Sequence, residues 1–307
     1  MKKVLVATEK PFAKVAVAGI KNILDEAGYE MVLLEKYHSA DDFQKSIAGV
    51  DALIVRSDKV TKEIVEAAAN LKIVVRAGAG YDNLDLKACS AKNIVAMNTP
   101  GQNSNAVAEL ALGMMLYMAR NCWEPGTGTE LKGKNLGIHA YGFVGKLVAA
   151  LGKGFGMNVY AFDPFVDSKI MKNDGVTPIT DVYELYAKCQ YVSLHIPANE
   201  QTKCSIGHKL ISSMPHGGTL VNTARKEVID EEGLLIALME RNDLKYATDV
   251  APDAMAKIRA SVGERIFATP KKMGAETAEA NINAGLAAAK QIVDFFEKGD
   301  VKCQVNK

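Results

Sequence analysis

This chain has few of the features that mark metal-binding, disulfide-rich or membrane proteins. Five of its 307 residues are cysteine, and they are scattered without a CxxC spacing. This pattern argues against a zinc site or a disulfide framework and favours a reducing environment. No apolar run approaches the roughly 18 residues of a membrane-spanning helix, and the apolar run near the N-terminus is too short for a signal peptide. We therefore expect a cytoplasmic protein.

Charge of one sign is also lacking. The 37 lysines and arginines balance 36 aspartates and glutamates, for a formal net charge of +1, and there is no basic tract. Strong binding to nucleic acid or to an anionic membrane is therefore not expected. The five histidines form no metal-ligand cluster and no Ser-His-Asp set. With 48% apolar and 24% charged residues, the chain has the composition of an ordinary globular protein long enough for two domains.

Strand-like and helix-like segments alternate along the chain, which predicts an α/β protein with parallel sheets and helices on both faces. The expected strands are 3–8, 31–35, 52–55, 72–77, 94–98, 136–139, 158–162, 191–195, 218–222, 246–249 and 266–268. The main expected helices are 12–27, 41–47, 61–69, 106–120 and 277–299. The long apolar helix 106–120 leads into a second domain, and the last helix returns to the first. The predicted domains are residues 1–98 with 283–307, and residues 99–282.

Residues 135–163 have the order and length of a dinucleotide-binding βαβ unit. A tight turn, Ala140-Tyr141-Gly142-Phe143-Val144-Gly145, separates an apolar strand from a helix. Gly142 allows the backbone to approach a pyrophosphate, Gly145 allows the helix to pack on the strand, and the helix N-terminus offers free N–H groups. Asp163 follows 18 residues after Gly145, where a carboxylate binds ribose hydroxyls and favours NAD over NADP. The alternative is an ordinary glycine turn, because the first glycine of the motif is Ala140.

Charged residues follow several of the later strands, at the edge where α/β sheets bind ligands. Arg225 is a candidate for clamping a substrate carboxylate and polarising its carbonyl; alternatively, it pairs on the surface with Glu227 or Asp230. Asp249 is a candidate acceptor for a nicotinamide carboxamide, or else it caps the next turn. Asp253 is a candidate for orienting a catalytic partner, although the local sequence favours a solvated loop aspartate.

Lys271 and Lys272 follow Pro270 after the last expected strand, and one of them is a candidate acid/base. Burial beside Arg225 would lower the pKa of such a lysine. A fall of this pKa from about 10.4 to about 7.5 requires that the charged form be destabilised by roughly 4 kcal/mol relative to the neutral form. For carbonyl reduction the protonated lysine suffices, so a smaller shift is enough. The alternative is that both lysines are solvated.

In the N-terminal third, Arg56 and Arg76 each end an expected strand, and glycines follow the second arginine. Two arginines and glycine-rich backbone are suited to an anionic substrate. Ser57 follows Arg56, and Asn98 and Asn103 lie near the proposed hinge. Alternatively, Gly78 and Gly80 form only a tight strand-to-helix turn and the arginines stay on the surface.

Seven segments together resemble the D-isomer-specific 2-hydroxyacid dehydrogenases. They are VVRAGAGYDNLDL (74–86), NTPGQNSNAVAEL (98–110), LGIHAYGFVGK (136–146), YVSLHIP (191–197), LVNTARKEVIDEEGL (220–234), ATDV (247–250) and ATPKKMGAETAEA (268–280). The resemblance implies two Rossmann-like, doubly wound domains with a cleft between them, NAD as cofactor and no metal.

The resemblance also implies residue roles. The implied cofactor contacts are Ala140, Tyr141, Gly142, Phe143, Val144, Gly145, Asp163, His195, Thr223 and Asp249. The implied substrate contacts are Arg56, Ser57, Arg76, Ala77, Gly78, Asn103 and Arg225. The implied catalytic residues are Arg225, Lys271, Lys272 and Asp253.

The chain departs from the family at the acid/base position. The usual histidine after Thr-Pro is replaced by Lys271-Lys272, with one extra residue in the segment. The position of the usual glutamate partner falls at Ala254, beside Asp253. We favour Lys271 as the acid/base because it directly follows Pro270, with Lys272 as the alternative.

Within the family, the chain is most similar to short D-3-phosphoglycerate dehydrogenases without a C-terminal regulatory domain. This implies oxidation of 3-phosphoglycerate to 3-phosphohydroxypyruvate, the first step of serine biosynthesis, in a homodimer or homotetramer. Helix 106–120 is the expected dimer element. One alternative is a reductase of glyoxylate, hydroxypyruvate or another D-2-hydroxyacid. Another is a non-catalytic NAD(H)-sensing binding protein, suggested by the missing histidine–glutamate pair.

Overall fold

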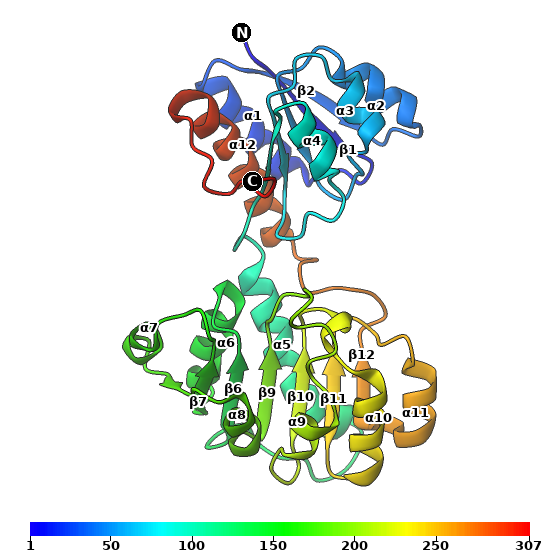
Figure 1. Ribbon diagram of the computed structural model, residues 1–307, viewed down its shortest axis with the longest axis vertical. Coiled ribbons are helices and arrows are strands. Elements are labelled where there is room, and N and C mark those ends of the chain that lie inside the picture. The colour runs from blue at the N-terminus through cyan, green and yellow to red at the C-terminus, as the bar shows by residue number, and fades with distance from the viewer. The chain divides into compact units, whose positions relative to one another are not determined.

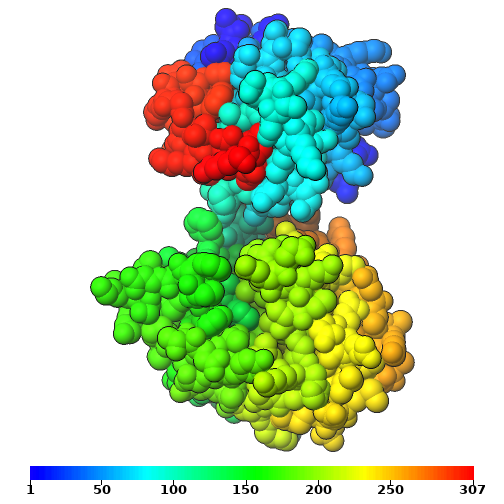
Figure 2. Space-filling view, in the orientation of Figure 1, coloured from blue at the N-terminus to red at the C-terminus, as the bar shows by residue number.

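The fold was obtained as a computed structural model that describes residues 1–307 (Figure 1). The chain divides into two compact units, each described here by itself. Unit 1 comprises Met1–Asn103 with Glu276–Lys307, and unit 2 comprises Ser104–Ala275. In Figure 2 the C-terminal residues, in red, lie in the same lobe as the blue and cyan N-terminal residues. Unit 1 is therefore built from both ends of the chain.

The two crossings between units lie a few residues from the expected positions 98/99 and 282/283. Asn98 and Thr99 still belong to unit 1, because they donate hydrogen bonds to Ala79 O and Gly78 O at 2.6 and 3.0 Å. On the return, Asn281 Oδ1 already accepts a hydrogen bond from Arg56 of unit 1. Unit 1 therefore extends beyond its expected bounds at both places, and the chain crosses between the units at 103/104 and 275/276.

Unit 1 is a five-stranded parallel sheet in the order β2-β1-β3-β4-β5, covered by helices on both faces. Its strands are β1 (Lys3–Thr8), β2 (Glu30–Glu35), β3 (Ala52–Val55), β4 (Ile73–Arg76) and β5 (Val95–Asn98). Its helices are α1 (Lys14–Glu26), α2 (Ala40–Ile47), α3 (Lys62–Ala67), α4 (Leu86–Ala91) and α12 (Ala278–Lys298).

The alternation of side chains along β1 explains the two helical layers of unit 1. Val4 and Val6 pack in one core with α1 and α12. Leu5 and Ala7 pack in a second core with α2, α3 and α4. Because successive side chains of a strand point to opposite faces, a strand that is apolar throughout must be buried on both sides.

Unit 2 is a seven-stranded parallel sheet in the order β12-β11-β10-β9-β6-β7-β8. Its strands are β6 (Asn135–His139), β7 (Asn158–Phe162), β8 (Thr177–Pro178), β9 (Tyr191–Leu194), β10 (Thr219–Asn222), β11 (Lys245–Thr248) and β12 (Ile266–Ala268). Its helices are α5 (Ser104–Ala119), α6 (Phe143–Gly154), α7 (Ser168–Asn173), α8 (Val182–Lys188), α9 (His208–Ser212), α10 (Glu231–Glu240) and α11 (Met255–Val262).

The strand order of unit 2 reverses between β6 and β9. From β6 the chain adds β7 and β8 on one side and then β9 to β12 on the other. Helices α5, α6 and α7 contribute to one core, and α8 to α11 contribute to the other; Figure 1 shows α5 behind the sheet and α8, α9 and α10 in front. In such sheets a ligand binds outside the carboxyl ends of the strands at the reversal. The predicted doubly wound, parallel α/β class is confirmed.

Two absences complete the description. None of the helices combines the length and apolar character needed to cross a membrane. No group of three or more His, Cys, Asp or Glu residues is arranged to hold a metal ion.

Candidate active site

The turn between β6 and α6 has the geometry expected of a phosphate-binding turn. Ala140 has a φ of 80°, in the left-handed region that glycine adopts more readily. A Cβ on Gly145 would lie 2.2 Å from the Ala140 carbonyl oxygen and 3.0 Å from Ile138 Cγ2. Only a glycine at position 145 therefore lets α6 pack this closely on β6.

Gly142 is a different case, because the fold itself does not require a glycine there. Its φ is −82°, and a Cβ at this position would meet no atom within 4 Å. Gly142 is also the N-cap of α6, and no side chain caps the helix. The first N–H groups of α6 and the open space beside Gly142 therefore suit the close approach of an anionic group such as a pyrophosphate.

Asp163 lies at the end of β7, next to the end of β6. Its Oδ2 accepts a hydrogen bond from Tyr141 N at 2.8 Å, and its Oδ1 accepts one from Phe165 N at 2.9 Å. Backbone donors thus fix the orientation of the carboxylate, and each oxygen keeps a lone pair. This partly exposed carboxylate is suited to accept hydrogen bonds from ribose hydroxyls.

Two histidines lie side by side at the reversal of strand order. His195 N donates to His139 O at 2.9 Å, and His139 Nδ1 lies 3.2 Å from the Tyr186 hydroxyl. Burial lowers the pKa of His139 to about 4, despite the opposing effect of Asp163. Burial, with a smaller effect of His139, lowers the pKa of His195 to about 3. Both imidazoles are therefore neutral at pH 7.

Two buried polar atoms beside the reversal have no hydrogen-bond partner. They are Nε2 of His195, just after β9, and Oγ1 of Thr223, just after β10. Buried polar atoms are usually paired, and the exceptions are common where a ligand is expected. The cofactor contacts predicted at His195 and Thr223 fit these unpaired atoms.

Arg225 is presented by the segment after β10. Asn222 holds this segment: its Nδ2 donates to Arg225 O and its Oδ1 accepts from Ala224 N, both at 2.9 Å. The Arg225 guanidinium donates one hydrogen bond, to Ala224 O at 2.9 Å, and makes no ion pair with Glu227 or Asp230. Asp230 instead caps α10. Most of the five guanidinium donors therefore remain for a carboxylate ligand.

Asp249, after β11, is buried, with 1% of its surface exposed. Its Oδ1 accepts hydrogen bonds from Thr269 Oγ1 at 2.9 Å and Met273 N at 2.7 Å. Its Oδ2 accepts one from Gly274 N at 2.8 Å. The carboxylate thus contacts the segment after β12, in addition to any contact it makes with a cofactor.

The segment after β12 carries the two candidate acid/base lysines. Both Lys271 and Lys272 are exposed. The burial that we expected for one of them is not found. Asp249 accepts hydrogen bonds from the residues on either side of them, Thr269 and Met273.

Asp253 has a partner in this structure. Its carboxylate, 80% exposed, forms an ion pair with Lys226 Nζ, the residue after Arg225. The Glu231 carboxylate accepts hydrogen bonds from Asp253 N and Ala254 N at 2.8 and 2.7 Å. The ion pair therefore ties this loop to the Arg225 segment, and Glu231 ties it to the start of α10.

In unit 1, Arg56 follows β3 and is held by its own unit. Its guanidinium donates to the carbonyl oxygens of Lys10 and Pro11 at 3.3 and 3.2 Å and to Asn281 Oδ1. It also lies over the Phe12 ring, 5.3 Å from the centroid. These contacts orient the arginine at the carboxyl edge of the sheet.

Arg76 ends β4, the strand next to β3. Its Nε donates to Arg56 O at 2.9 Å, so the two predicted substrate arginines are adjacent. Gly78 has a φ of 147°, and a Cβ there would lie 1.6 Å from Arg76 Nη1. The Arg76 guanidinium therefore packs over the Cα of Gly78. Of the other predicted contacts, Ser57 is exposed, Ala77 is buried, and Asn103 is partly exposed at the end of unit 1.

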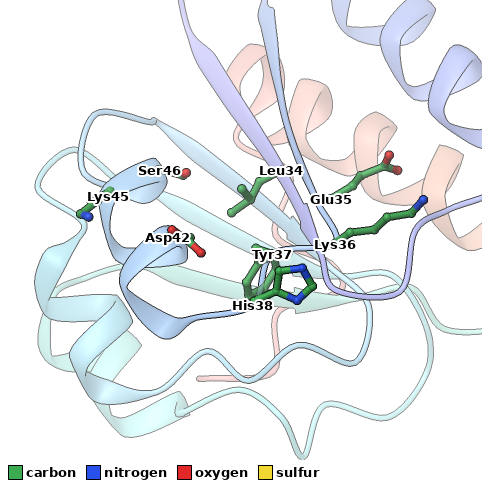
Figure 3. Close-up of a pocket in the computed structure, with 8 residues that line it drawn as sticks. All are labelled: Leu34, Glu35, Lys36, Tyr37, His38, Asp42, Lys45 and Ser46. Atoms are coloured by element: carbon green, nitrogen blue, oxygen red, sulfur yellow. The ribbon is translucent and has the colours of Figure 1, made fainter.

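Unit 1 also has a surface hollow of about 430 Å³ beside β2 and α2 (Figure 3). In Figure 3, Asp42, Lys45 and Ser46 come from α2, whereas Glu35 and Lys36 point away from them. None of the predicted substrate residues lines this hollow.

The structure thus brings the predicted cofactor residues together at the carboxyl edge of the unit 2 sheet and the two substrate arginines together in unit 1. Sequence reasoning missed the residues that hold these candidates, namely Asn222, Lys226, Glu231, Thr269 and Asn281. Most are separated from their partners by twenty or more positions, so no local signal marks them.

Comparisons with known proteins identify the family to which the chain belongs. The family model described as D-isomer specific 2-hydroxyacid dehydrogenase, NAD binding domain, matches residues 110–270, which all lie in unit 2. A structure of NAD+-bound 3-phosphoglycerate dehydrogenase from Entamoeba histolytica is 51% identical, with a TM-score of 0.87. That match covers 100% of this chain and 99% of the other.

Two curated relatives are each 35% identical. The hydroxypyruvate reductase of Thermotoga maritima matches over 88% of this chain and 92% of its own length. The D-3-phosphoglycerate dehydrogenase of Methanocaldococcus jannaschii matches over 82% of this chain but 51% of its own length. The chain thus spans about half the length of that relative. The family and the NAD cofactor predicted from sequence are confirmed. The chain belongs to the D-isomer-specific 2-hydroxyacid dehydrogenases, which are NAD-dependent oxidoreductases, and its unit 2 carries their NAD-binding domain.

Proposed function

We propose that this protein is an NAD-dependent D-3-phosphoglycerate dehydrogenase, which interconverts 3-phosphoglycerate and 3-phosphohydroxypyruvate. The observation that carries the proposal is the 51% identity, over the whole of both chains, to the NAD+-bound 3-phosphoglycerate dehydrogenase of Entamoeba histolytica. The reaction is the first step of serine biosynthesis, and we place it in the cytoplasm because all five cysteines are free thiols.

In the proposed mechanism, written as reduction, Arg225 binds the substrate carboxylate and polarises the neighbouring carbonyl. Lys271, or alternatively Lys272, gives the proton to the carbonyl oxygen. Bound NADH supplies the hydride. Arg56 and Arg76 hold the phosphate, because guanidinium groups match phosphate oxygens in geometry and charge.

The choice of NAD over NADP rests on Asp163. Backbone donors hold its carboxylate in place. A negative charge there accepts hydrogen bonds from the ribose and repels a 2′-phosphate.

The deciding experiment measures NADH oxidation with 3-phosphohydroxypyruvate for the wild type, Lys271→Ala and Lys272→Ala. We expect turnover by the wild type and loss in one variant, which identifies the acid/base lysine. Turnover retained in both variants would refute the lysine mechanism. No turnover by the wild type would refute the proposed function.

A second candidate is hydroxypyruvate reduction, because the Thermotoga maritima relative of that name matches over nearly its full length. The two candidates differ in the need for the phosphate. If Arg56 binds phosphate, Arg56→Ala raises the KM for 3-phosphohydroxypyruvate and leaves the KM for hydroxypyruvate unchanged. Equal effects on both substrates would favour the reductase.

We also propose that the protein is a homodimer, with α5 and the residues after it in the interface. Trp123, just after α5, is 64% exposed, and its ring contacts Tyr117 of α5 at 5.9 Å. Light scattering should give about twice the 33.0 kDa chain mass, and Trp123→Asp should shift the protein toward the monomer. A wild-type mass of one chain would contradict the proposal, and a mass of four would indicate a tetramer.

A further inference from the structure

Unit 1 has a second hollow, of about 280 Å³, at the carboxyl edge of its sheet. It is lined by residues that follow β1, β2 and β3 and by residues of α2 and α3. Tyr37 and His38 line both this hollow and the one in Figure 3, so the two are adjacent. We name it the Tyr37 hollow. None of the predicted substrate or cofactor residues lines it, so the proposed reaction gives it no role.

The floor of the Tyr37 hollow is apolar. Phe43 of α2 and Ile64 of α3 are 2% and 3% exposed, and both line the hollow. The Tyr37 ring packs against Phe43, with 5.5 Å between the ring centroids. Pockets for drug-sized ligands have volumes of roughly 300–1,000 Å³. A hollow slightly below this range suits a small ligand with an apolar or aromatic part.

Beside the hollow lies a buried carboxylate that the chain satisfies only in part. Asp58 is 6% exposed, and its Oδ1 accepts hydrogen bonds from Glu9 N and the Tyr37 hydroxyl, both at 2.7 Å. Both donors belong to residues that line the hollow. Asp58 Oδ2 is buried and has no hydrogen-bond partner. Because a buried carboxylate is costly unless it is paired, Oδ2 marks a place where a donor from outside the chain is expected.

The rim of the hollow carries charges of both signs. Glu9 and Lys59 line it and are exposed. Neither of them forms an ion pair, and neither does Asp58. Glu9 directly follows β1, and Lys59 follows Asp58 after β3, the neighbouring strand. One unpaired ammonium group near two unpaired carboxylates complements a ligand that itself carries both charges.

We propose that the Tyr37 hollow binds an α-amino acid with an apolar or aromatic side chain. The ammonium group of the ligand pairs with Glu9 and supplies the donor that Asp58 Oδ2 lacks. The carboxylate of the ligand pairs with Lys59, and its side chain packs on Tyr37 and Phe43. Because Oδ2 is buried, rim side chains must move when the ligand enters, and those of Glu9 and Lys59 are held by no ion pair. The proposal does not depend on the dehydrogenase function, since no residue of the hollow takes part in that reaction.

Proton NMR of isotope-labelled histidine rings tests the binding without an enzyme assay. His38 lines the hollow and is the one histidine of unit 1, and the signals that disappear in His38→Gln identify it. Titration with L-phenylalanine should shift the His38 signals and leave those of the unit 2 histidines unchanged. This outcome is expected even if the protein turns over no 2-ketoacid. Unchanged His38 signals at millimolar L-phenylalanine would overturn the proposal.

Two analogues of this probe show which charges the hollow requires. Phenethylamine lacks the carboxylate of L-phenylalanine, and 3-phenylpropionate lacks its ammonium group. Each analogue should bind with a Kd about tenfold higher than that of L-phenylalanine, because one ion pair is lost. A Kd for either analogue equal to that of L-phenylalanine would show that one of the two charges is not recognised, and would overturn the assignment to an amino acid.

Variants of the charged residues locate the contacts. Asp58→Asn and Lys59→Met should each raise the Kd for L-phenylalanine about tenfold. Glu9→Gln should do the same, and it keeps the backbone N–H that Asp58 accepts, so it remains informative if Asp58→Asn fails to fold. Asp25→Asn and Lys21→Met are the matched controls, because they remove an exposed ion pair on α1, which covers the other face of the sheet. Wild-type Kd values in Glu9→Gln and Lys59→Met would overturn the proposal.

Discussion

The carboxyl edges of the two sheets differ in how far each unit satisfies its own polar groups. In unit 1, Arg56 donates to two backbone carbonyls and to Asn281, and the Arg76 guanidinium fills the space over Gly78. In unit 2, Arg225 makes one hydrogen bond, and the space beside Gly142 is open.

The two glycines show what this difference means. Each follows a strand, and each is part of a predicted binding site. Gly78 is needed by the fold, because it accommodates a side chain of its own unit. Gly142 is not needed by the fold, so we attribute the glycine at this position to the binding of a ligand. An open glycine beside unpaired N–H groups therefore indicates a binding site more strongly than a glycine packed against its own chain.

The largest expected effect comes from a third glycine, Gly145, which the fold needs. The Cβ of Gly145→Ala would lie 2.2 Å from the Ala140 carbonyl oxygen, a backbone atom that cannot move freely. We expect the free energy of unfolding to fall by about 3 kcal/mol, measured by urea denaturation. Gly154→Ala, at the end of the same helix with open space around it, is the control. Equal stability of the two variants would show that α6 can move away from β6.

The next effect is a pH dependence of stability that differs between the two units. In unit 2, burial lowers the pKa of His139 to about 4 and that of His195 to about 3, whereas unit 1 contains only the exposed His38. The unfolded chain takes up a proton at His139 below pH 6.5 and the folded chain does not, so stability falls as the pH drops from 6.5 toward 4. Between pH 6.5 and 5 the contribution of His139 to this loss is about 1.6 kcal/mol.

Denaturation at pH 7 and pH 5 measures this loss. His139→Gln should reduce the pH dependence, and the control His216→Gln, at an exposed position, should not. A pH dependence that is unchanged in His139→Gln would contradict the assignment. Hydrogen exchange at pH 5 should show faster opening in unit 2 than in unit 1.

A comparable effect is expected for Gly78→Ala. The added Cβ would displace the Arg76 guanidinium, and a φ of 147° is unfavourable for alanine. We expect a loss of about 2 kcal/mol in stability and a higher KM for 3-phosphohydroxypyruvate, with the Kd for NADH unchanged. A higher Kd for NADH would break the separation of roles between the two units.

Gly142→Ala is the opposite case. The fold has room for the Cβ, so the free energy of unfolding should stay within about 0.5 kcal/mol of the wild type. The added Cβ would displace a ligand phosphate close to this position. We therefore expect the Kd for NADH to rise tenfold, which corresponds to about 1.4 kcal/mol of binding free energy. Tryptophan or NADH fluorescence measures it. Unchanged affinity would show that the open space is not used.

The smallest expected effect is a gain. Ala140 has a φ of 80°, where a Cβ is unfavourable. Ala140→Gly should raise the free energy of unfolding by about 0.5–1 kcal/mol, since strain relief exceeds the greater entropy of glycine in the unfolded chain. Thermal unfolding with and without NAD measures this change, and a lower melting temperature would contradict it.

Local patterns predicted much of the fold. The alternation of strands and helices was sufficient for two parallel sheets, and helices 106–120 and 277–299 correspond to α5 and α12. The two-residue strand β8 was not predicted, because Thr177 and Pro178 have no strand pattern and pair only through β7. In the candidate site, Asp163 and Gly145 lie where the motif spacing indicated. The roles of Arg225 and the lysines remain predictions.

The sequence alone determined the fold class and the family and located the turn predicted to bind NAD, because each rests on local patterns: alternating segments, short motifs and the spacing within one βαβ unit. Only the tertiary structure decided which groups pair: Asp249 with Met273, Asp253 with Lys226, and Arg56 with Asn281. These partners come together because strands far apart in sequence are neighbours in the sheet or because the last helix returns to unit 1. Strand order arises from the packing of whole elements, so no local pattern contains it.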